Sequence, residues 1–243
     1  MIGIISGSAL EALTGVSIEA RERMATPYGE HSGLLARGRC GSVPVVLLRR
    51  HGEQQEIAPH RVNYRANLWA LHALGVRRVI AVNTVGGIAR DLGPGTLAIP
   101  EQIVDYTWGR AHTFYDTEPV SHAEFTHPYA ESLRLELIAA AERAGVDVQL
   151  GGIYGATQGP RLETAAEIDR LERDGCDIVG MTGMPEAALA CELELDYACI
   201  AVVVNRAAGR GSTAIAAQMQ SYLAQGMASA CRVLGAFLSA QRG

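Results

Sequence analysis

Short apolar runs alternate along this chain with longer stretches of helical periodicity, and this alternation constrains the fold more than any other feature. The clearest run, Arg78–Thr84, leads to Gly86 and Gly87 and is typical of a strand buried on both faces. The stretch from Pro59 to Leu74 has helical periodicity, with proline at its start and Gly75 directly after its end. We therefore expect a single α/β domain over residues 1–243, with a mixed, largely parallel central sheet flanked by helices.

The same patterns predict the other elements. Strands are expected at Ile2–Ser6, Leu34–Arg39, Val43–Leu48, Leu97–Val104, Val148–Thr157, Asp177–Met181 and Tyr197–Asn205. A turn at Gly7 and Ser8 is expected to lead into a short helix that ends at Leu13. Further helices are expected at Ala130–Ala144, Glu163–Arg173, Pro185–Leu193 and within Ile215–Ser239. A long polar loop from Asp105 to Pro128 carries His112, His122 and His127. Because loops of this length often have a function or form an interface, these histidines are noted as candidates.

Composition narrows the possible partners and the compartment. The net charge of −5 argues against a nucleic-acid surface, which needs clustered Lys and Arg, and Tyr197–Val204, the longest strongly apolar stretch, is too short to span a bilayer. The N-terminus lacks the basic start of a signal peptide and instead resembles a first strand. Five cysteines, an odd number without any Cys-x-x-Cys pair, predict reduced thiols and no zinc site. We therefore expect a cytoplasmic protein with neither a nucleic-acid nor a membrane partner.

Several residues suited to binding an anion follow the predicted strands. In parallel sheets, ligands bind beyond the C-terminal ends of the strands. These ends carry Ser8, Arg50, His51, Thr84 and Thr182. Free backbone N–H groups at the start of a helix favour phosphate, and arginine can bind phosphate in a bidentate manner. Each residue also has an ordinary alternative: a helix N-cap for Ser8, a surface ion pair for Arg50 and turn hydroxyls for the threonines. Their convergence indicates an anion site.

Well-known catalytic motifs are missing from the sequence, which narrows the choice of chemistry. There is no Gly-x-x-x-x-Gly-Lys-Ser/Thr loop for nucleoside triphosphates, and no Gly-x-Gly-x-x-Gly follows a strand. The sequence also lacks the Gly-x-Ser-x-Gly turn of serine hydrolases and the His-Glu-x-x-His helix of zinc proteases. The predicted anion site therefore belongs to another class of enzyme or binding protein.

Longer motifs connect the chain with a known family. They are Thr157-Gln158-Gly159-Pro160-Arg161-Leu162-Glu163-Thr164, Met181-Thr182-Gly183-Met184-Pro185-Glu186, Ser6-Gly7-Ser8, Arg50-His51, Asn63-Tyr64-Arg65-Ala66-Asn67-Leu68-Trp69-Ala70 and Asn83-Thr84-Val85-Gly86-Gly87. In residue type, order and spacing, they resemble the trimeric purine nucleoside phosphorylase and methylthioadenosine phosphorylase family. The resemblance extends from about Ile2 to Asn205 and fades in the last predicted helix.

The resemblance implies a nucleoside phosphorylase-like fold and a role for each motif residue. Phosphate would be bound by Ser8, Arg50, His51, Thr84 and Thr182. Met181 would lie under the ribose, and Glu163 and Asn205 would contact the purine and act in catalysis. It also implies a homotrimer that needs no cofactor and no metal, with inorganic phosphate as a co-substrate. Ser6 and Ala9 stand where the family more often has glycines, and Leu162 replaces an aromatic residue that often packs against the base.

Glu163 and Asn205 bear on the choice of purine. A carboxylate can accept the N1 proton of a 6-oxopurine but faces an acceptor at N1 of adenine, and an asparagine amide can donate to O6. In the resemblance, members acting on adenosine have aspartates where Asn205 and Ala207 stand. Without the resemblance, Glu163 would be an acidic residue in a first helical turn and Asn205 a turn residue.

The implied reaction is pentosyl transfer to phosphate. The expected substrate is S-methyl-5′-thioinosine, and the alternatives are S-methyl-5′-thioadenosine, inosine or guanosine. A purine nucleoside-binding module without activity is the alternative outside enzymology, and loss of the phosphate-binding residues would favour it.

Overall fold

The computed structural model describes residues 1–7, 13, 15–116 and 120–241. Within these residues eleven strands join one sheet. The strands are β1 (Ile2–Ser6), β2 (Val16–Glu22), β3 (Leu35–Cys40), β4 (Val43–Arg49), β5 (Arg78–Gly87), β6 (Leu97–Ile99), β7 (Gln102–Asp105), β8 (Val148–Leu150), β9 (Ile153–Ala156), β10 (Ile178–Gly180) and β11 (Asp196–Arg206).

The sheet is mixed and mostly parallel, as the sequence predicts. Its main path runs β2-β3-β4-β1-β5-β10-β9-β7, and β11 pairs with β5 and leads to β6 and β8. Strands β1, β4, β5 and β11 run in the same direction, as do β7, β9 and β10, whereas β10 pairs antiparallel to the end of β5. This reversal places Gly180, at the end of β10, against the side chain of Val85.

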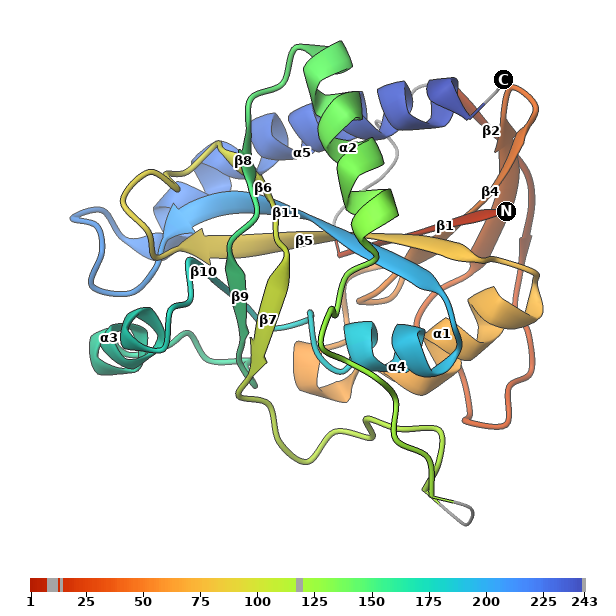
Figure 1. Ribbon diagram of the computed structural model, residues 1–243, viewed down its shortest axis with the longest axis horizontal. Coiled ribbons are helices and arrows are strands. Elements are labelled where there is room, and N and C mark those ends of the chain that lie inside the picture. Colours follow the sequence, from red (N-terminus) through yellow and green to blue (C-terminus); the bar gives the residue numbers. More distant parts are fainter. Residues whose placement is uncertain (8–12, 14, 117–119, 242–243) are drawn as a thin grey trace.

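Helices cover both faces of the sheet (Figure 1). Helices α1 (Tyr64–Ala73) and α4 (Glu186–Glu192) pack on one face, and α2 (Glu131–Ala144) and α5 (Ile215–Ala240) pack on the other. Helix α3 (Ala165–Arg173) forms a smaller core beside the end of the sheet, and a short 3-10 helix at Pro59–Arg61 precedes α1. This arrangement confirms the predicted α/β fold.

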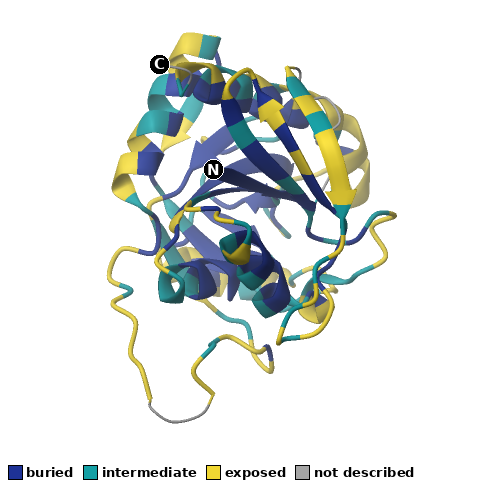
Figure 2. Cartoon of the chain, turned by 90° about the vertical axis from the view of Figure 1, so that its right-hand side faces the viewer, coloured by how far each residue is buried: buried dark blue, intermediate teal, exposed yellow. Residues whose placement is uncertain are grey.

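The alternation of side chains along β5 explains the two cores. Val79 and Ala81 contact the core beneath α1 and α4, whereas Ile80 and Val82 contact the core beneath α2 and α5. Successive residues of a strand point to opposite faces, so a strand covered on both sides must be apolar throughout. Figure 2 shows the resulting buried centre of the sheet.

Two predicted strands are each divided in the structure. Leu97–Val104 becomes β6 and β7, separated at Pro100, which has no N–H to donate to a ladder. Val148–Thr157 becomes β8 and β9, separated at Gly151 and Gly152, whose φ angles of 78° and 99° lie in the left-handed region. In both cases the chain leaves the β6–β8 pair and enters the β7–β9 pair at these residues.

Helix starts also differ from the prediction, because side chains cap the helices. Asn63 accepts a hydrogen bond from the backbone of Ala66, so α1 begins at Tyr64 and not at Pro59. Thr164 and Glu167 form a capping box, so α3 begins at Ala165. The predicted helix that ends at Leu13 falls mostly outside the described residues.

Strand β2, which was not predicted, forms the edge of the sheet and pairs antiparallel with β3. Its side chains alternate between half-buried and exposed over part of its length, a pattern typical of an edge strand. The alternation of Val16, Ile18 and Ala20 with polar residues was the available signal.

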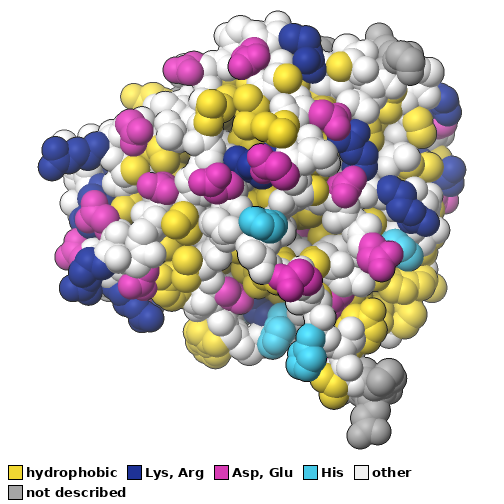
Figure 3. All heavy atoms as spheres, in the orientation of Figure 1, with side chains coloured by type: hydrophobic (Ala, Val, Ile, Leu, Met, Phe, Trp, Pro, Cys, Tyr) yellow, Lys and Arg dark blue, Asp and Glu magenta, His cyan; other side chains and the backbone are white. Residues whose placement is uncertain are grey.

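The face of the molecule drawn in Figure 3 agrees with the charge balance of the sequence. On the face drawn in Figure 3, acidic and basic side chains are interspersed. No helix in the described part of the chain is both long and apolar enough to cross a membrane.

Candidate active site

A pocket opens where β1, β4, β5, β10 and β11 end, and every predicted site residue that the structure describes lines it. These residues are Arg50, His51, Thr84, Glu163, Met181, Thr182 and Asn205. Ser8 lies outside the described residues, and its neighbour Gly7 lines the pocket. The pairing of the strands therefore brings together residues from distant parts of the chain, as the rule for strand ends predicts.

A β-bulge aims Asn205 into the pocket. The pairing of β11 with β5 shifts register between Val203 and Asn205, and a bulge re-aims the side chains that follow it. The Asn205 Nδ2 atom donates to the carbonyl oxygen of Arg206 at 2.8 Å, which leaves its second hydrogen and Oδ1 for a ligand. A Cβ atom on Gly86 would lie 3.0 Å from this Nδ2, so the glycine leaves room for the amide.

Glu163 lies before α3, ahead of the N-cap Thr164, so its assignment to a first helical turn is wrong. The hydroxyl of Thr157 donates to Glu163 Oε1 at 2.6 Å. Glu163 Oε2 remains available to a ligand in the pocket. Thr157 is a contributor that the sequence analysis did not assign to the site, although it begins one of the recognised motifs.

Met181 lines the pocket beside the loop that carries Glu163. Gly159 in this loop has a φ of 63°, and a Cβ there would lie 2.5 Å from the Met181 sulfur. Only glycine combines this backbone conformation with so close an approach. Gly159 therefore allows Met181 to pack directly against the loop.

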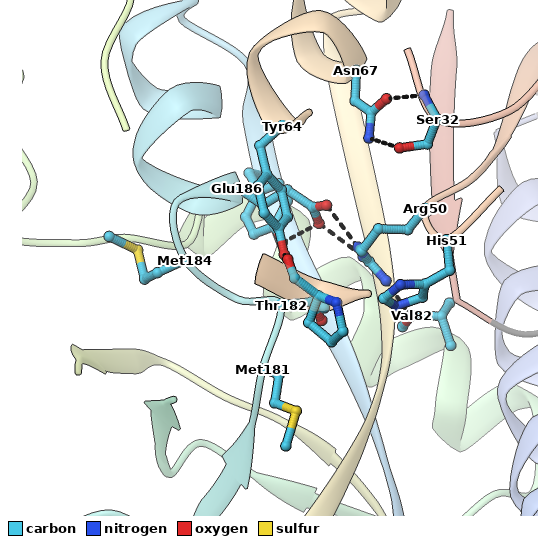
Figure 4. Close-up of polar contacts among 12 residues, drawn as sticks. Ser32, Arg50, His51, Tyr64, Asn67, Val82, Met181, Thr182, Met184 and Glu186 are labelled. Atoms are coloured by element: carbon cyan, nitrogen blue, oxygen red, sulfur yellow. Dashed lines mark hydrogen bonds and ion pairs between the residues drawn. The ribbon is translucent and has the colours of Figure 1, made fainter. Parts of the chain in front are cut away.

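Arg50 is almost completely buried, with 1% of its surface exposed, and its alternative assignment as a surface residue is wrong. Its Nε and Nη2 atoms donate to the two carboxylate oxygens of Glu186 at 2.7 and 2.8 Å, and Nη1 donates to the carbonyl oxygen of Val82 at 3.2 Å. Figure 4 shows Arg50 between this carboxylate and His51. Burial alone would lower the pKa of Arg50, but the facing Glu186 carboxylate outweighs burial and raises it. The guanidinium therefore carries its charge at the pocket wall.

His51 presents one ring nitrogen to the pocket. Its Nδ1 atom lies 2.8 Å from the carbonyl oxygen of Ile57, which can only accept, so Nδ1 carries the proton. A Cβ atom on Gly7 would lie 3.2 Å from the other nitrogen, Nε2. Burial and the neighbouring Arg50 charge lower the pKa of His51. The ring is therefore neutral near pH 7.

Arg110, in the long loop after β7, is a buried residue that the sequence analysis did not identify. Its guanidinium donates to carbonyl oxygens on both loops that border the pocket, and to the side chains of Gln158 and Tyr64. The acceptors include the carbonyl oxygens of Met181 (2.9 Å), Thr157 (3.2 Å) and Gln158 (2.7 Å) and the Gln158 Oε1 atom (3.1 Å). Arg110 therefore joins the loop that carries Glu163 to the loop that carries Met181 and Thr182. An arginine in a polar loop gives no periodic signal by which sequence reasoning could have found it.

The loop histidines do not reach the pocket within one chain. His122 and His127 are exposed, and neither lines the pocket. His112 donates from Nδ1 to the Arg110 carbonyl oxygen at 3.1 Å. Phe125 packs against the core under α1 and α4 of its own chain.

Known proteins are similar to this chain in both sequence and fold. The model of the phosphorylase superfamily matches residues 1–239. A probable S-methyl-5′-thioinosine phosphorylase from Pseudomonas syringae pv. tomato is 51% identical over 240 residues, which cover 98% of each chain. A 6-oxopurine nucleoside phosphorylase from Pyrococcus furiosus is 44% identical over 86% of this chain and 80% of that protein.

A solved structure agrees with these relatives. The methylthioadenosine phosphorylase of Schistosoma mansoni in complex with adenine has a TM-score of 0.93 and 31% identity, and the match covers 99% of this chain and 91% of that one. The sequence, the fold and the gathering of the motif residues around one pocket thus agree, and the chain belongs to the phosphorylase superfamily.

Proposed function

We propose that this chain catalyses the phosphorolysis of S-methyl-5′-thioinosine to hypoxanthine and 5-methylthioribose 1-phosphate, a reaction of purine salvage. The observation that carries the proposal is the presence of Glu163 and Asn205 in one pocket with Arg50 and His51. Relatives about half identical over most of the chain bear the name of this activity.

The base end of the pocket supports a 6-oxopurine. Glu163 accepts the N1 proton, and Asn205 donates to O6 or N7. Ala207 lines the same pocket and has no polar side-chain atom to pair with an adenine amino group. With adenine, the carboxylate of Glu163 faces an unprotonated N1 and gains no hydrogen bond, which costs about 1–3 kcal/mol.

The reaction exchanges one bond at C1′ for another. An oxygen of phosphate forms the new bond to C1′, while the C1′–N9 bond breaks and its electron pair leaves with the purine. The sugar passes through an oxocarbenium-like state, which the phosphate anion stabilises. Arg50 donates to the phosphate, the neutral His51 accepts through Nε2 from its protonated oxygen, and Asn205 donates to N7 as negative charge develops on the base. Positioning and electrostatics supply the catalysis, and neither a cofactor nor a metal enters this proposal.

The 5′ end of the substrate needs an apolar surface if it carries a methylthio group. Ile215 and Met219 are among the apolar side chains that line the pocket and can supply such a surface. We also propose a homotrimer, in which the loop with His122, Phe125 and His127, whose histidines are exposed in the single chain, completes this end of the site from a neighbouring subunit. None of the five cysteines, all of them described, forms a disulfide, and most are buried, which supports a reducing, cytoplasmic location.

One side-by-side assay tests the proposal. Release of free base is measured from methylthioinosine, methylthioadenosine, inosine and guanosine, each with and without phosphate. The proposal expects phosphate-dependent release with the highest kcat/KM for methylthioinosine. Preference for methylthioadenosine would contradict the assignment of the base site, and preference for inosine or guanosine would contradict the methylthio pocket.

A further inference from the structure

We infer that Glu186 is a positioning residue, which orients the Arg50 guanidinium so that it presents a fixed edge to phosphate. The inference rests on the proposed function, because it takes phosphate as the ligand of Arg50. Glu186 itself does not line the pocket, so its effect must pass through Arg50.

The contact between Glu186 and Arg50 is geometrically specific. The two carboxylate oxygens accept from Nε and Nη2 at 2.7 and 2.8 Å, so two parallel hydrogen bonds hold the guanidinium plane. The Val82 carbonyl oxygen accepts from Nη1 and adds a third point of attachment. Figure 4 shows the carboxylate and the guanidinium side by side.

Glu186 is itself held from a different element. Its side chain is completely buried on α4, and the hydroxyl of Tyr197 on β11 donates to its Oε1 atom at 2.9 Å. A buried carboxylate without such partners would be very unfavourable. Helix α4, strand β11 and the end of β4 thus meet in one hydrogen-bonded chain from Tyr197 through Glu186 to Arg50.

This hydrogen-bonded chain of side chains determines which N–H groups of Arg50 remain for a ligand. Arginine has five N–H groups, and within the described residues three of them donate to Glu186 and Val82. One hydrogen remains on each Nη atom. A Cβ atom on Gly7 would lie 3.9 Å from Nη1 and 3.2 Å from His51 Nε2. The free hydrogen of Nη1 and the His51 ring therefore converge on the turn after β1, where phosphate is proposed to bind.

Electrostatics alone would give Glu186 the opposite effect. Its negative charge repels phosphate and partly neutralises Arg50, so its removal would strengthen phosphate binding if charge were decisive. The buried bidentate geometry favours orientation as the larger effect. A glutamine at this position can accept only with Oε1, and its amide N–H groups would face those of Arg50. The two possibilities therefore predict changes of opposite sign in the KM for phosphate.

The test compares Glu186→Gln and Tyr197→Phe with a matched control, Glu136→Gln. Glu136 on α2 pairs with Arg78 at 2.6 Å away from the pocket, so the control removes an ion pair by the same chemical change. For each protein the KM for phosphate, the KM for nucleoside, kcat and Tm are measured. We expect Glu186→Gln to raise the phosphate KM about tenfold or more while the nucleoside KM changes less than about twofold. Tyr197→Phe keeps the ion pair, so a rise of about two- to fivefold is expected, and the control leaves both KM values unchanged.

The results separate this inference from the proposed function. An unchanged or lowered phosphate KM in folded Glu186→Gln, or an equal rise in both KM values, would overturn the inference while phosphate dependence of the wild type still stands. Base release by the wild type without phosphate would overturn the proposed function and the inference with it. If Glu186→Gln does not fold, Tyr197→Phe decides, since it retains the buried charges.

Discussion

The hydroxyl of Thr157 donates a hydrogen bond to the Oε1 atom of Glu163 at 2.6 Å, across a loop that also contains Gly159. The bond holds one carboxylate oxygen against the loop and leaves the other for the base. We therefore expect Thr157→Val to lower kcat/KM for the 6-oxopurine nucleoside about fivefold, which corresponds to the loss of about 1 kcal/mol. Thr157→Ser retains the hydroxyl and is the control. Equal activity of the valine and serine variants would contradict the role of this bond.

Substitution of Arg50 should weaken the binding of phosphate more than the binding of the nucleoside. Arg50→Ala is expected to raise the KM for phosphate strongly, because the pocket loses its buried guanidinium. The substitution also leaves the Glu186 carboxylate buried without its partner, so the stability should fall by roughly 3–5 kcal/mol. Kinetics at varied phosphate and thermal unfolding measure the two effects separately. An undiminished rate of base release in phosphate-free buffer would instead indicate a hydrolase.

A change of base preference tests Asn205 and Glu163 together. Asn205→Asp should improve the use of methylthioadenosine relative to methylthioinosine, because a carboxyl group can accept from the 6-amino group and, when protonated, donate to N7. Correcting a mispaired buried group is worth roughly 1–3 kcal/mol, or about ten- to hundredfold in relative kcat/KM. Adding Glu163→Ser should shift the preference further than either single change. The kcat/KM values of both nucleosides for the wild type and the three variants check this, and a double variant no better than Asn205→Asp would contradict it.

Arg110 should contribute to both stability and activity. Arg110→Met leaves the carbonyl oxygens of Met181, Thr157 and Gln158 without their buried donor, at a cost of roughly 3 kcal/mol. We expect the Tm to fall by about 10 °C and kcat/KM to fall because two pocket loops lose their connection. Arg143→Met, at an exposed position on α2, is the control. A folded Arg110→Met variant with wild-type kcat/KM would show that the loops hold their positions without it.

Because the folded protein holds His31 as a neutral ring, we predict that its free energy of unfolding falls in mild acid. Its Nε2 atom accepts from the Met24 N–H at 2.9 Å, and Nδ1 donates to the Gly33 carbonyl oxygen at 2.6 Å, so the folded protein holds the neutral ring. Burial lowers the pKa of His31 below its usual 6.5. As the pH falls from about 6.5 toward the lowered pKa, the unfolded chain binds a proton that the folded chain does not, so stability decreases with acid.

Denaturant unfolding between pH 7.5 and 5 measures this slope. His31→Gln should make the slope shallower while lowering the stability at every pH, because it replaces only part of the bonding. A slope identical to that of the wild type would exclude His31 as its source.

The local order of elements could be predicted because it is encoded locally. The apolar run at Arg78–Thr84 and the glycines after it predicted a buried strand and the pocket edge that follows it. The sequence also contains the residues that divide two predicted strands, Pro100 in one and Gly151 and Gly152 in the other. The divisions were not predicted, because the apolar residues on either side of them form one continuous pattern. The edge strand β2 was missed because half-exposed strands carry weak patterns.

The sequence by itself determined the α/β class and the strand ends whose polar residues line the pocket. These follow from periodicity and from the meeting of parallel strand ends at one edge. The tertiary structure alone decided which partners those residues have. Arg50 and Glu186 are 136 positions apart, and Arg110 is bound by carbonyl oxygens from two distant loops. Such bonds depend on where the packed backbone places each group, and no local pattern of side chains records that position.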